Sequence, residues 1–313
     1  MATAATNSAR RRRAADLDGE RAMVCLVGEQ PVPNLLPIWH LRLRQIILIE
    51  SPPTERVGRN VEALLKPQHE VLHRKIDPYD VVSAENALRT LLNDPSQPRR
   101  AATFNVTGGT KPMSLAAFEV AREMRAPVIY LQSEGSESVL HYYIFEDGNV
   151  ALQKTENIDE LLSIDDYLRA HGLTGSKRRE ATDSFHRHVF EPLRPHVSEI
   201  VSGVAVDTLE IDLVIRCVNQ VGVAEVKSGK AATLKNGIDQ LSTASQREYL
   251  GTYTKRFLIV DRPPEANNQR LAEAHNIEVI CLQDEHGTGL SKDETKKLVQ
   301  TVTQALGLTP AHG

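Results

Sequence analysis

Short apolar runs alternate with amphipathic segments along the first half of the chain. Each run is rich in Val, Ile and Leu and ends in turn-forming residues, which predicts buried strands. The predicted strands are 23–27, 45–50, 69–76, 102–106, 127–131 and 139–145. Helical spacing of apolar residues predicts helices at 54–66, 83–92 and 111–125. This alternation predicts an α/β fold, a parallel, doubly wound sheet of the Rossmann-like kind, which gathers ligands at the strand carboxyl ends.

The second half has a different pattern. Successive strand-like runs at 201–206, 210–218 and 222–226 follow a predicted helix at 179–193 and favour an antiparallel meander. The elements expected after the meander are a helix at 236–249, strands at 257–261 and 277–282, and a C-terminal helix. This half is therefore expected to be α+β.

A turn-rich polar stretch separates the two patterns and marks a domain boundary. We expect a short helix near 158–170 within it. The expected organisation is a disordered basic arm at 1–21, a first domain at 22–150, a linker at 151–176 and a second domain at 177–313.

Composition narrows the class of protein. The chain has 313 residues, 41% of them hydrophobic and 25% charged, which excludes a disordered or fibrous protein. A net charge of -4 argues against a constitutive polyelectrolyte binder of nucleic acid. Its three cysteines have no CxxC spacing, which argues against a disulfide framework or a zinc cage. Without an apolar run of about 18 residues, we expect a soluble, cytoplasmic protein with no membrane partner.

The segment between the strand at 102–106 and the helix at 111–125 has the features of an anion-binding loop. Two glycines allow a tight turn, and the following helix start offers unpaired N–H groups and a positive dipole end. The spacing is neither the Walker nor the dinucleotide pattern, and a plain turn is the alternative. The candidate residues are Thr107, Gly108, Gly109, Thr110, Lys111 and Ser114.

Polar residues after the first two strands lie at the same expected sheet edge. Gly28, Gln30 and Asn34 follow the first strand and Ser51 follows the second. They are candidates for ligand contact, with turn formation as the alternative for each.

Three charged residues of the second half are predicted to converge. Side chains alternate between the faces of a strand, so Glu225 and Lys227 point the same way, and an adjacent antiparallel strand can bring Asp212 beside them. Two carboxylates among apolar neighbours suit an oxygen-preferring divalent ion such as Mg or Mn, and a neighbouring lysine can hold the attacking water. A solvent-facing salt-bridge set is the alternative.

The charged residues of the second half and the glycine-containing loop of the first half each resemble a known motif. Asp212, then Glu225-Val226-Lys227, with Glu191 on a preceding helix and Gln240 on a following one, resembles the PD-(D/E)XK nuclease core, which is restriction-endonuclease-like. The strand, Thr-Gly-Gly-Thr-Lys and helix segment resembles the CARF domain. Together they resemble the CARF-domain nucleases of type III CRISPR systems, the CRISPR ancillary nucleases.

The resemblance implies roles for individual residues. Asp212, Glu225 and the Val226 carbonyl would be metal ligands and Lys227 the catalytic lysine. Glu191 would orient a water, and Gln240 would position Lys227 or the substrate. The loop residues of the first domain would contact a cyclic oligoadenylate.

The resemblance also implies a function. We expect a homodimeric antiviral effector, activated by a cyclic oligoadenylate, most simply cyclic tetra-adenylate, that cuts DNA, RNA or both with a divalent metal. The alternatives are a CARF-type regulator that binds nucleic acid without cutting it, and a nuclease with an unrelated nucleotide sensor. The short region between the domains leaves their relative placement open, and Glu210 could share the role of Asp212.

Overall fold

The computed structural model describes residues 22–93, 102–134, 137–174, 177–178, 183–206, 209–246, 249–251, 254–284 and 288–308. The predicted basic arm at 1–21 lies outside them. The chain divides into two compact units, residues 1–162 with 169–172 and residues 163–168 with 173–313. Among the described residues, no helix has the length and apolar character needed to cross a bilayer.

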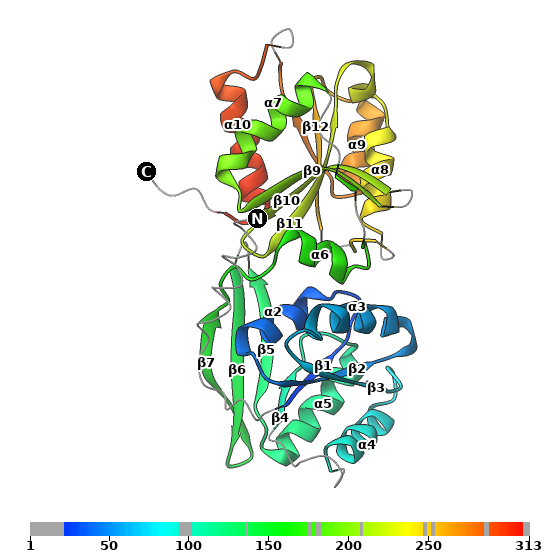
Figure 1. Cartoon of the computed structure of the whole chain (residues 1–313), viewed down its shortest axis with the longest axis vertical. Coiled ribbons are helices and arrows are strands. Elements are labelled where there is room, and N and C mark those ends of the chain that lie inside the picture. Colours follow the sequence, from blue (N-terminus) through cyan, green and yellow to red (C-terminus); the bar gives the residue numbers. More distant parts are fainter. Residues whose placement is uncertain are drawn as a thin grey trace. The chain divides into compact units, whose positions relative to one another are not determined.

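A seven-stranded sheet in the order β3-β2-β1-β4-β5-β6-β7 forms the centre of the first unit (Figure 1). Its strands are β1 Ala22–Leu26, β2 Gln45–Glu50, β3 Glu70–Lys75, β4 Ala102–Asn105, β5 Val128–Glu134, β6 Glu137–Glu146 and β7 Asn149–Asn157. Pairing is parallel from β3 to β5 and antiparallel from β5 to β7. Because β1 pairs with β2 on one side and β4 on the other, the carboxyl ends of β1 and β4 flank a topological switch point.

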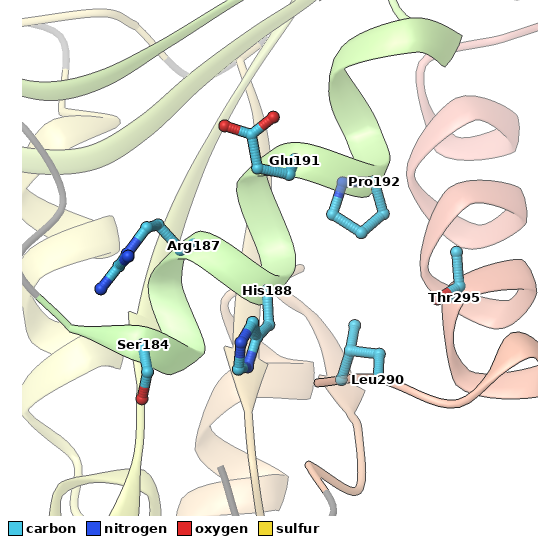
Figure 2. Close-up of a pocket in the computed structure, with 7 residues that line it drawn as sticks. All are labelled: Ser184, Arg187, His188, Glu191, Pro192, Leu290 and Thr295. Atoms are coloured by element: carbon cyan, nitrogen blue, oxygen red, sulfur yellow. The ribbon is translucent and has the colours of Figure 1, made fainter. Parts of the chain in front are cut away.

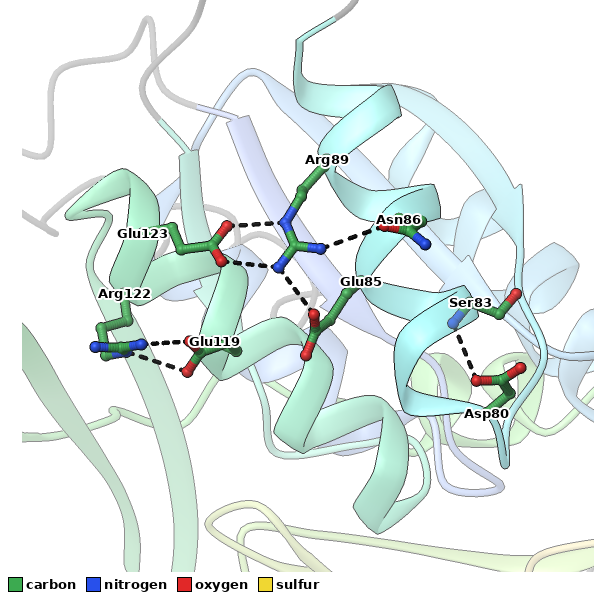
Figure 3. Close-up of polar contacts among 8 residues, drawn as sticks. All are labelled: Asp80, Ser83, Glu85, Asn86, Arg89, Glu119, Arg122 and Glu123. Atoms are coloured by element: carbon green, nitrogen blue, oxygen red, sulfur yellow. Dashed lines mark hydrogen bonds and ion pairs between the residues drawn. The ribbon is translucent and has the colours of Figure 1, made fainter.

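Helices complete this unit. They are α2 Val32–Leu41, α3 Glu55–Leu65, α4 Val81–Leu92 and α5 Lys111–Met124, with a 3-10 turn at Pro52–Thr54. Buried residues of α4 and α5 pack on the sheet in one apolar cluster. At their solvent side, Arg89 of α4 donates to Glu85 and Glu123, each at 2.8 Å, and so joins the two helices (Figure 3). Exposed ion pairs of this kind contribute about 0–1 kcal/mol each, so burial of the apolar faces holds the pair together.

Two elements of this unit were not predicted. α2 carries Pro33 in its first turn and Pro37 inside, and most of its residues are buried, so it shows neither the composition nor the polar stripe that marks a surface helix. β7 is largely exposed, and its sequence has no apolar run that would predict a strand. It occupies part of 151–176, the range expected to be a linker, because pairing with β6 alone makes it a strand.

The second unit has a six-stranded sheet in the order β13-β12-β11-β10-β9-β8. Its strands are β8 Lys177–Arg178, β9 Glu199–Val206, β10 Leu209–Cys217, β11 Gln220–Lys227, β12 Lys255–Val260 and β13 Glu278–Cys281. The predicted meander is confirmed, since β9, β10 and β11 pair antiparallel. β12 and β13 continue the sheet in parallel with β11.

Helices lie on both faces of this sheet (Figure 1). The helical elements from 164 onward are α6 Ile164–Ala170, α7 Ser184–Leu193, α8 Asn236–Ala244, α9 Ala266–Ala274 and α10 Lys292–Ala305, with 3-10 turns at Arg194–His196 and Gly229–Thr233. Leu213, Ile215, Ala224 and Val226 face α7 and α10 in one apolar cluster. Alternation along β10 and β11 turns Asp212, Glu225 and Lys227 to the opposite face, where α8 packs. The predicted fold class, α/β followed by α+β, is confirmed.

Candidate functional site

The loop between β4 and α5 is pressed against the end of β1. A Cβ atom on Gly108 would lie 2.2 Å from the carbonyl oxygen of Leu26, and one on Gly28 would lie 3.0 Å from the nitrogen of Gly109. Gly109 has a φ of +76°, in the left-handed region. Only glycine fits such close approaches of backbone to backbone. The loops that follow β1 and β4 therefore meet at the switch point.

The start of α5 keeps an ammonium group open to solvent. Thr110 is the N-cap, and its Oγ1 accepts from the nitrogen of Met113 at 3.4 Å and donates to the carbonyl of Pro78. Lys111 is exposed and has no hydrogen bond or ion pair with any residue that the structure describes. The positive end of the helix and this cation lie at the same edge of the sheet, as an anion site requires.

Two other residues predicted for this site, Asn34 and Ser51, are buried and make hydrogen bonds inside the protein. Asn34 is fully buried, donates to the Leu26 carbonyl at 3.0 Å and accepts from Asn105 at 3.1 Å. Ser51 is buried, and its nitrogen and hydroxyl both contact Thr54 Oγ1. In this structure the polar atoms of Asn34 and Ser51 make hydrogen bonds within the protein, and ligand contact by either residue stays a prediction.

The hydroxyl groups of the loop are also engaged. Thr107 Oγ1 donates to Asn105 Oδ1 at 2.6 Å and accepts from the nitrogen of Leu131 at 2.8 Å. Ser114 Oγ lies 3.2 Å from the carbonyl of Thr110. Gln30 is half-buried, with its Oε1 3.5 Å from a ring nitrogen of His171. The loop thus offers a ligand mainly its backbone and Lys111.

The three charged residues of the second unit, Asp212, Glu225 and Lys227, lie close together as predicted. Lys227 Nζ lies 3.0 Å from Asp212 Oδ2 and 2.6 Å from Glu225 Oε2. The nitrogen of Val226 donates to the same Asp212 oxygen at 2.8 Å. The side chain of Glu225 is only 2% exposed, against 23% for Asp212 and 19% for Lys227. We refer to Asp212, Glu225 and Lys227 as the acid–lysine cluster.

Burial dominates the electrostatics of this cluster. Burial, together with the negative charge of Asp212, raises the pKa of Glu225 to about 8, although Lys227 acts in the opposite direction. Burial lowers the pKa of Lys227, but the two carboxylates outweigh it and the net shift is upward. Lys227 therefore stays cationic, and Glu225 takes up a proton far more readily than an ordinary carboxyl group.

The two helical residues predicted for the cluster differ in placement. Gln240 is half-buried on α8, one turn after Gly237, where a Cβ atom would lie 3.5 Å from Lys227 Cγ and 3.8 Å from Glu225 Cβ. Gln240 is therefore on the helix that covers the cluster. Glu191 is exposed on α7, on the other side of the sheet, and no hydrogen bond or ion pair between it and the cluster occurs among the described residues.

Glu191 instead borders a separate pocket of about 470 Å³ between α7 and the region around α10 (Figure 2). Its lining residues are Ser184, Arg187, His188, Glu191, Pro192, Leu290 and Thr295. A ring nitrogen of His188 lies 3.0 Å from Asp284 Oδ2. This pocket and the acid–lysine cluster are thus different places in the second unit.

Sequence reasoning missed the start of α7 as a neighbour of the cluster. His186 has a hydrogen bond with the backbone of Asp212, and burial lowers its pKa. Asp183, the N-cap of α7, accepts from Ser228 at 2.9 Å, one residue beyond Lys227. An Asp just before the helix was the available signal for the cap, whereas nothing in the spacing joined His186 to Asp212.

Two carboxylates are the ligands that the cluster could offer to a divalent cation. Across the residues that the structure describes, no group of three or more His, Cys, Asp or Glu side chains has a metal-binding arrangement. Any further ligand to an ion at Asp212 and Glu225 would have to be a backbone oxygen or water, which Mg and Mn accept.

Comparison with known proteins finds one matching family model and several solved structures with a similar fold. Residues 22–167 match the family model described as the Card1 CARF domain. Can2 from Sulfobacillus thermosulfidooxidans, solved in complex with cyclic tetra-adenylate, superposes with a TM-score of 0.69 at 16% identity, over 92% of this chain and 98% of Can2. No curated protein matches the sequence.

Two further structures share the fold. Protein VC1899 from Vibrio cholerae has a TM-score of 0.68 at 14% identity, over 93% of this chain and 100% of its own. A type III CRISPR defence DNA nuclease activated by cyclic oligoadenylate has a TM-score of 0.60 at 16% identity. The superposition covers 92% of this chain but only 53% of that nuclease. Residues 22–167 thus match the Card1 CARF domain, within a chain that has the fold of Can2.

Proposed function

We propose that this protein is a metal-dependent nuclease that a cyclic oligoadenylate activates, acting as a type III CRISPR antiviral effector. The observation that carries the proposal is the acid–lysine cluster, in which a nearly inaccessible carboxylate shares one ammonium group with a second carboxylate. Such an arrangement suits hydrolysis of a phosphodiester in DNA, RNA or both.

Asp212 and Glu225 are the residues that would hold Mg or Mn, with the Val226 carbonyl as a third ligand. Two hard oxygen anions fit either ion, and the upward pKa shift of Glu225 supports the assignment, because the cluster lacks positive charge when both acids are ionised. When bound, the ion would polarise the phosphate and lower the pKa of the attacking water.

The protein's own groups orient the site. The nitrogen of Val226 and the ammonium of Lys227 together hold Asp212 Oδ2 in place. Lys227 remains charged, so it can stabilise negative charge that develops on the phosphate. Gln240 lies on the covering helix, and we assign it the positioning of Lys227 or the substrate. We leave Glu191 out of the mechanism because it borders a different pocket.

The CARF domain would sense cyclic tetra-adenylate, the ligand in the Can2 structure. Gly28, Gln30 and the Thr107–Lys111 loop would supply contacts, with Ser114 beneath, while Asn34 and Ser51 fix the loops in place. A ligand with two-fold symmetry suits a homodimer, and binding would shift the protein towards a cleavage-competent state.

One observation favours a second candidate, a CARF-type regulator that binds nucleic acid without cutting it. Lys227 contacts both carboxylates at hydrogen-bond distance, which is also the geometry of a closed structural ion pair. In that case no divalent ion is needed.

Incubating the protein with plasmid DNA and with RNA, in the presence of Mn and cyclic tetra-adenylate, separates these functions. We expect strand cleavage only when both the ion and the ligand are present. Retarded migration without cleavage supports the regulator. Cleavage that ignores the ligand would disprove the assigned role of the CARF domain.

A further inference from the structure

The loop between β3 and α4, residues 76–80, reaches the anion-binding loop. Its Pro78 carbonyl accepts a hydrogen bond from Thr110 Oγ1, the N-cap of α5. β3 is separated from β4 by β2 and β1 in the sheet, so this contact brings a distant strand end to the rim of the loop. Whatever binds at the start of α5 therefore lies near residue 79.

Tyr79 follows Pro78 directly and is 80% exposed, the largest exposed fraction among the large hydrophobic side chains that the structure describes. Its backbone is well held, because its nitrogen donates to Asp77 Oδ1 at 2.8 Å and Asp80 caps α4 by accepting from Ser83. The backbone of Tyr79 is thus fixed by hydrogen bonds in the turn, while its aromatic ring is exposed to solvent.

Two more exposed apolar side chains lie on the elements that meet at this contact. Val82, in the first turn of α4, is 66% exposed, and Leu115, one turn after Lys111 on α5, is 63% exposed. Apolar groups beside an anion loop are not explained by phosphate binding, which needs only N–H groups and cations. They are explained by a ligand that has both a phosphate and a flat apolar part.

We propose that Tyr79 stacks on a nucleobase of the ligand whose phosphate lies at the Gly108–Lys111 loop, and so makes the site selective for nucleotides over simple phosphates. The inference rests on the proposed function of the CARF domain and adds a specificity-determining residue to it. Aromatic stacking on a base contributes about 1–3 kcal/mol, and it tolerates different bases because each has a π-face. Lys111 would then bind the charged phosphate of the ligand, and Tyr79 would stack on its base.

Calorimetric titration of cyclic tetra-adenylate into the full chain tests this division of labour. We expect Tyr79→Ala to weaken binding by roughly 5- to 150-fold and Tyr79→Phe to change it by less than about 3-fold. Val150→Ala, which truncates an exposed side chain on the edge strand β7, is the matched control and should change binding little. Lys111→Ala should also weaken binding, but it alone should reduce the salt dependence of affinity.

A cyclic tetranucleotide with 2-aminopurine in place of one adenine gives a direct readout of stacking. Its fluorescence should be quenched on binding to wild type and to Tyr79→Phe, and much less on binding to Tyr79→Ala at saturation. Equal affinity and equal quenching with Tyr79→Ala would overturn the stacking role. Failure of the wild-type protein to bind the ligand at all would instead overturn the proposed function of the domain.

Discussion

Lys227 Nζ lies 2.6 Å from Oε2 of Glu225, whose side chain is 2% exposed. The same ammonium group lies 3.0 Å from Asp212, so one cation serves two carboxylates. A buried carboxylate that shares a cation with a second carboxylate is costly to ionise, because water cannot solvate it. This imbalance of charge is the physical basis for proposing a divalent ion at the cluster.

Replacing Glu225 by Gln should abolish metal-dependent cleavage and leave the CARF domain unaffected. The amide keeps the shape of the side chain but cannot offer an anionic oxygen, and losing a metal ligand should reduce the rate by about 100-fold or more. Gel assays of plasmid cleavage in Mn with cyclic tetra-adenylate would measure this. Calorimetry should show unchanged ligand affinity; full activity of the variant would remove the cluster from the mechanism.

The raised pKa of Glu225 predicts how stability depends on pH in chelator-treated protein. Its folded pKa of about 8 lies above the ordinary value of 4.5, so between these values the folded state holds a proton that the unfolded state has released. The free energy of unfolding should therefore fall as pH rises from about 5 to about 8. Urea unfolding across this range, with Glu225→Gln as the variant that lacks the dependence, measures it.

The same titration predicts a pH dependence of ion binding. An ion at Glu225 must displace the proton, so apparent Mn affinity should rise by up to about tenfold per pH unit below pH 8 and level off above it. Added Mn should also stabilise the wild type most at high pH. A flat profile in calorimetric Mn titrations between pH 6 and 8 would contradict a role for Glu225 as ligand.

Gly108→Ala should remove binding of cyclic tetra-adenylate. The new Cβ atom would meet the Leu26 carbonyl oxygen at 2.2 Å, and backbone on both sides must move to relieve the clash. Overpacking of this kind destabilises by about 1–3 kcal/mol and would shift the loop away from the end of β1. Calorimetry and thermal unfolding measure the two effects. A variant that binds as tightly as wild type would show that the loop is not the ligand site.

Glu199→Ala should destabilise the second unit much more than loss of a surface pair. Glu199 Oε2 accepts from Arg216 Nε at 3.2 Å and from the nitrogen of Ile164 at 2.9 Å, and Arg216 is only 1% exposed. Removing the carboxylate takes a charged hydrogen-bond partner away from a buried guanidinium, a loss of about 3 kcal/mol. The control, Glu119→Ala in the exposed pair with Arg122, should change stability by less than about 1 kcal/mol in urea unfolding.

Local patterns of apolar and polar residues were enough to predict the order of most elements and the faces of the strands that carry Asp212, Glu225 and Lys227. The strand predicted at 45–50 coincides with β2, because its unbroken apolar run can only be buried. Because side chains alternate along β11, the sequence predicted that Glu225 and Lys227 point the same way. The predicted meander then brought Asp212 beside them. These properties depend on neighbours that are close in sequence.

Local patterns could not predict which polar atoms remain available to a ligand, because that depends on how distant segments pack together. Asn34 and Asn105 are 71 positions apart and hydrogen-bond to each other, so Asn34 supports the loop from inside rather than from its open face. Gly237 lets α8 approach Lys227, and His186 reaches the backbone of Asp212, through contacts that no local spacing encodes. Helix and strand patterns report burial of apolar groups, which is local and periodic, whereas a hydrogen bond is assigned only once distant segments have packed.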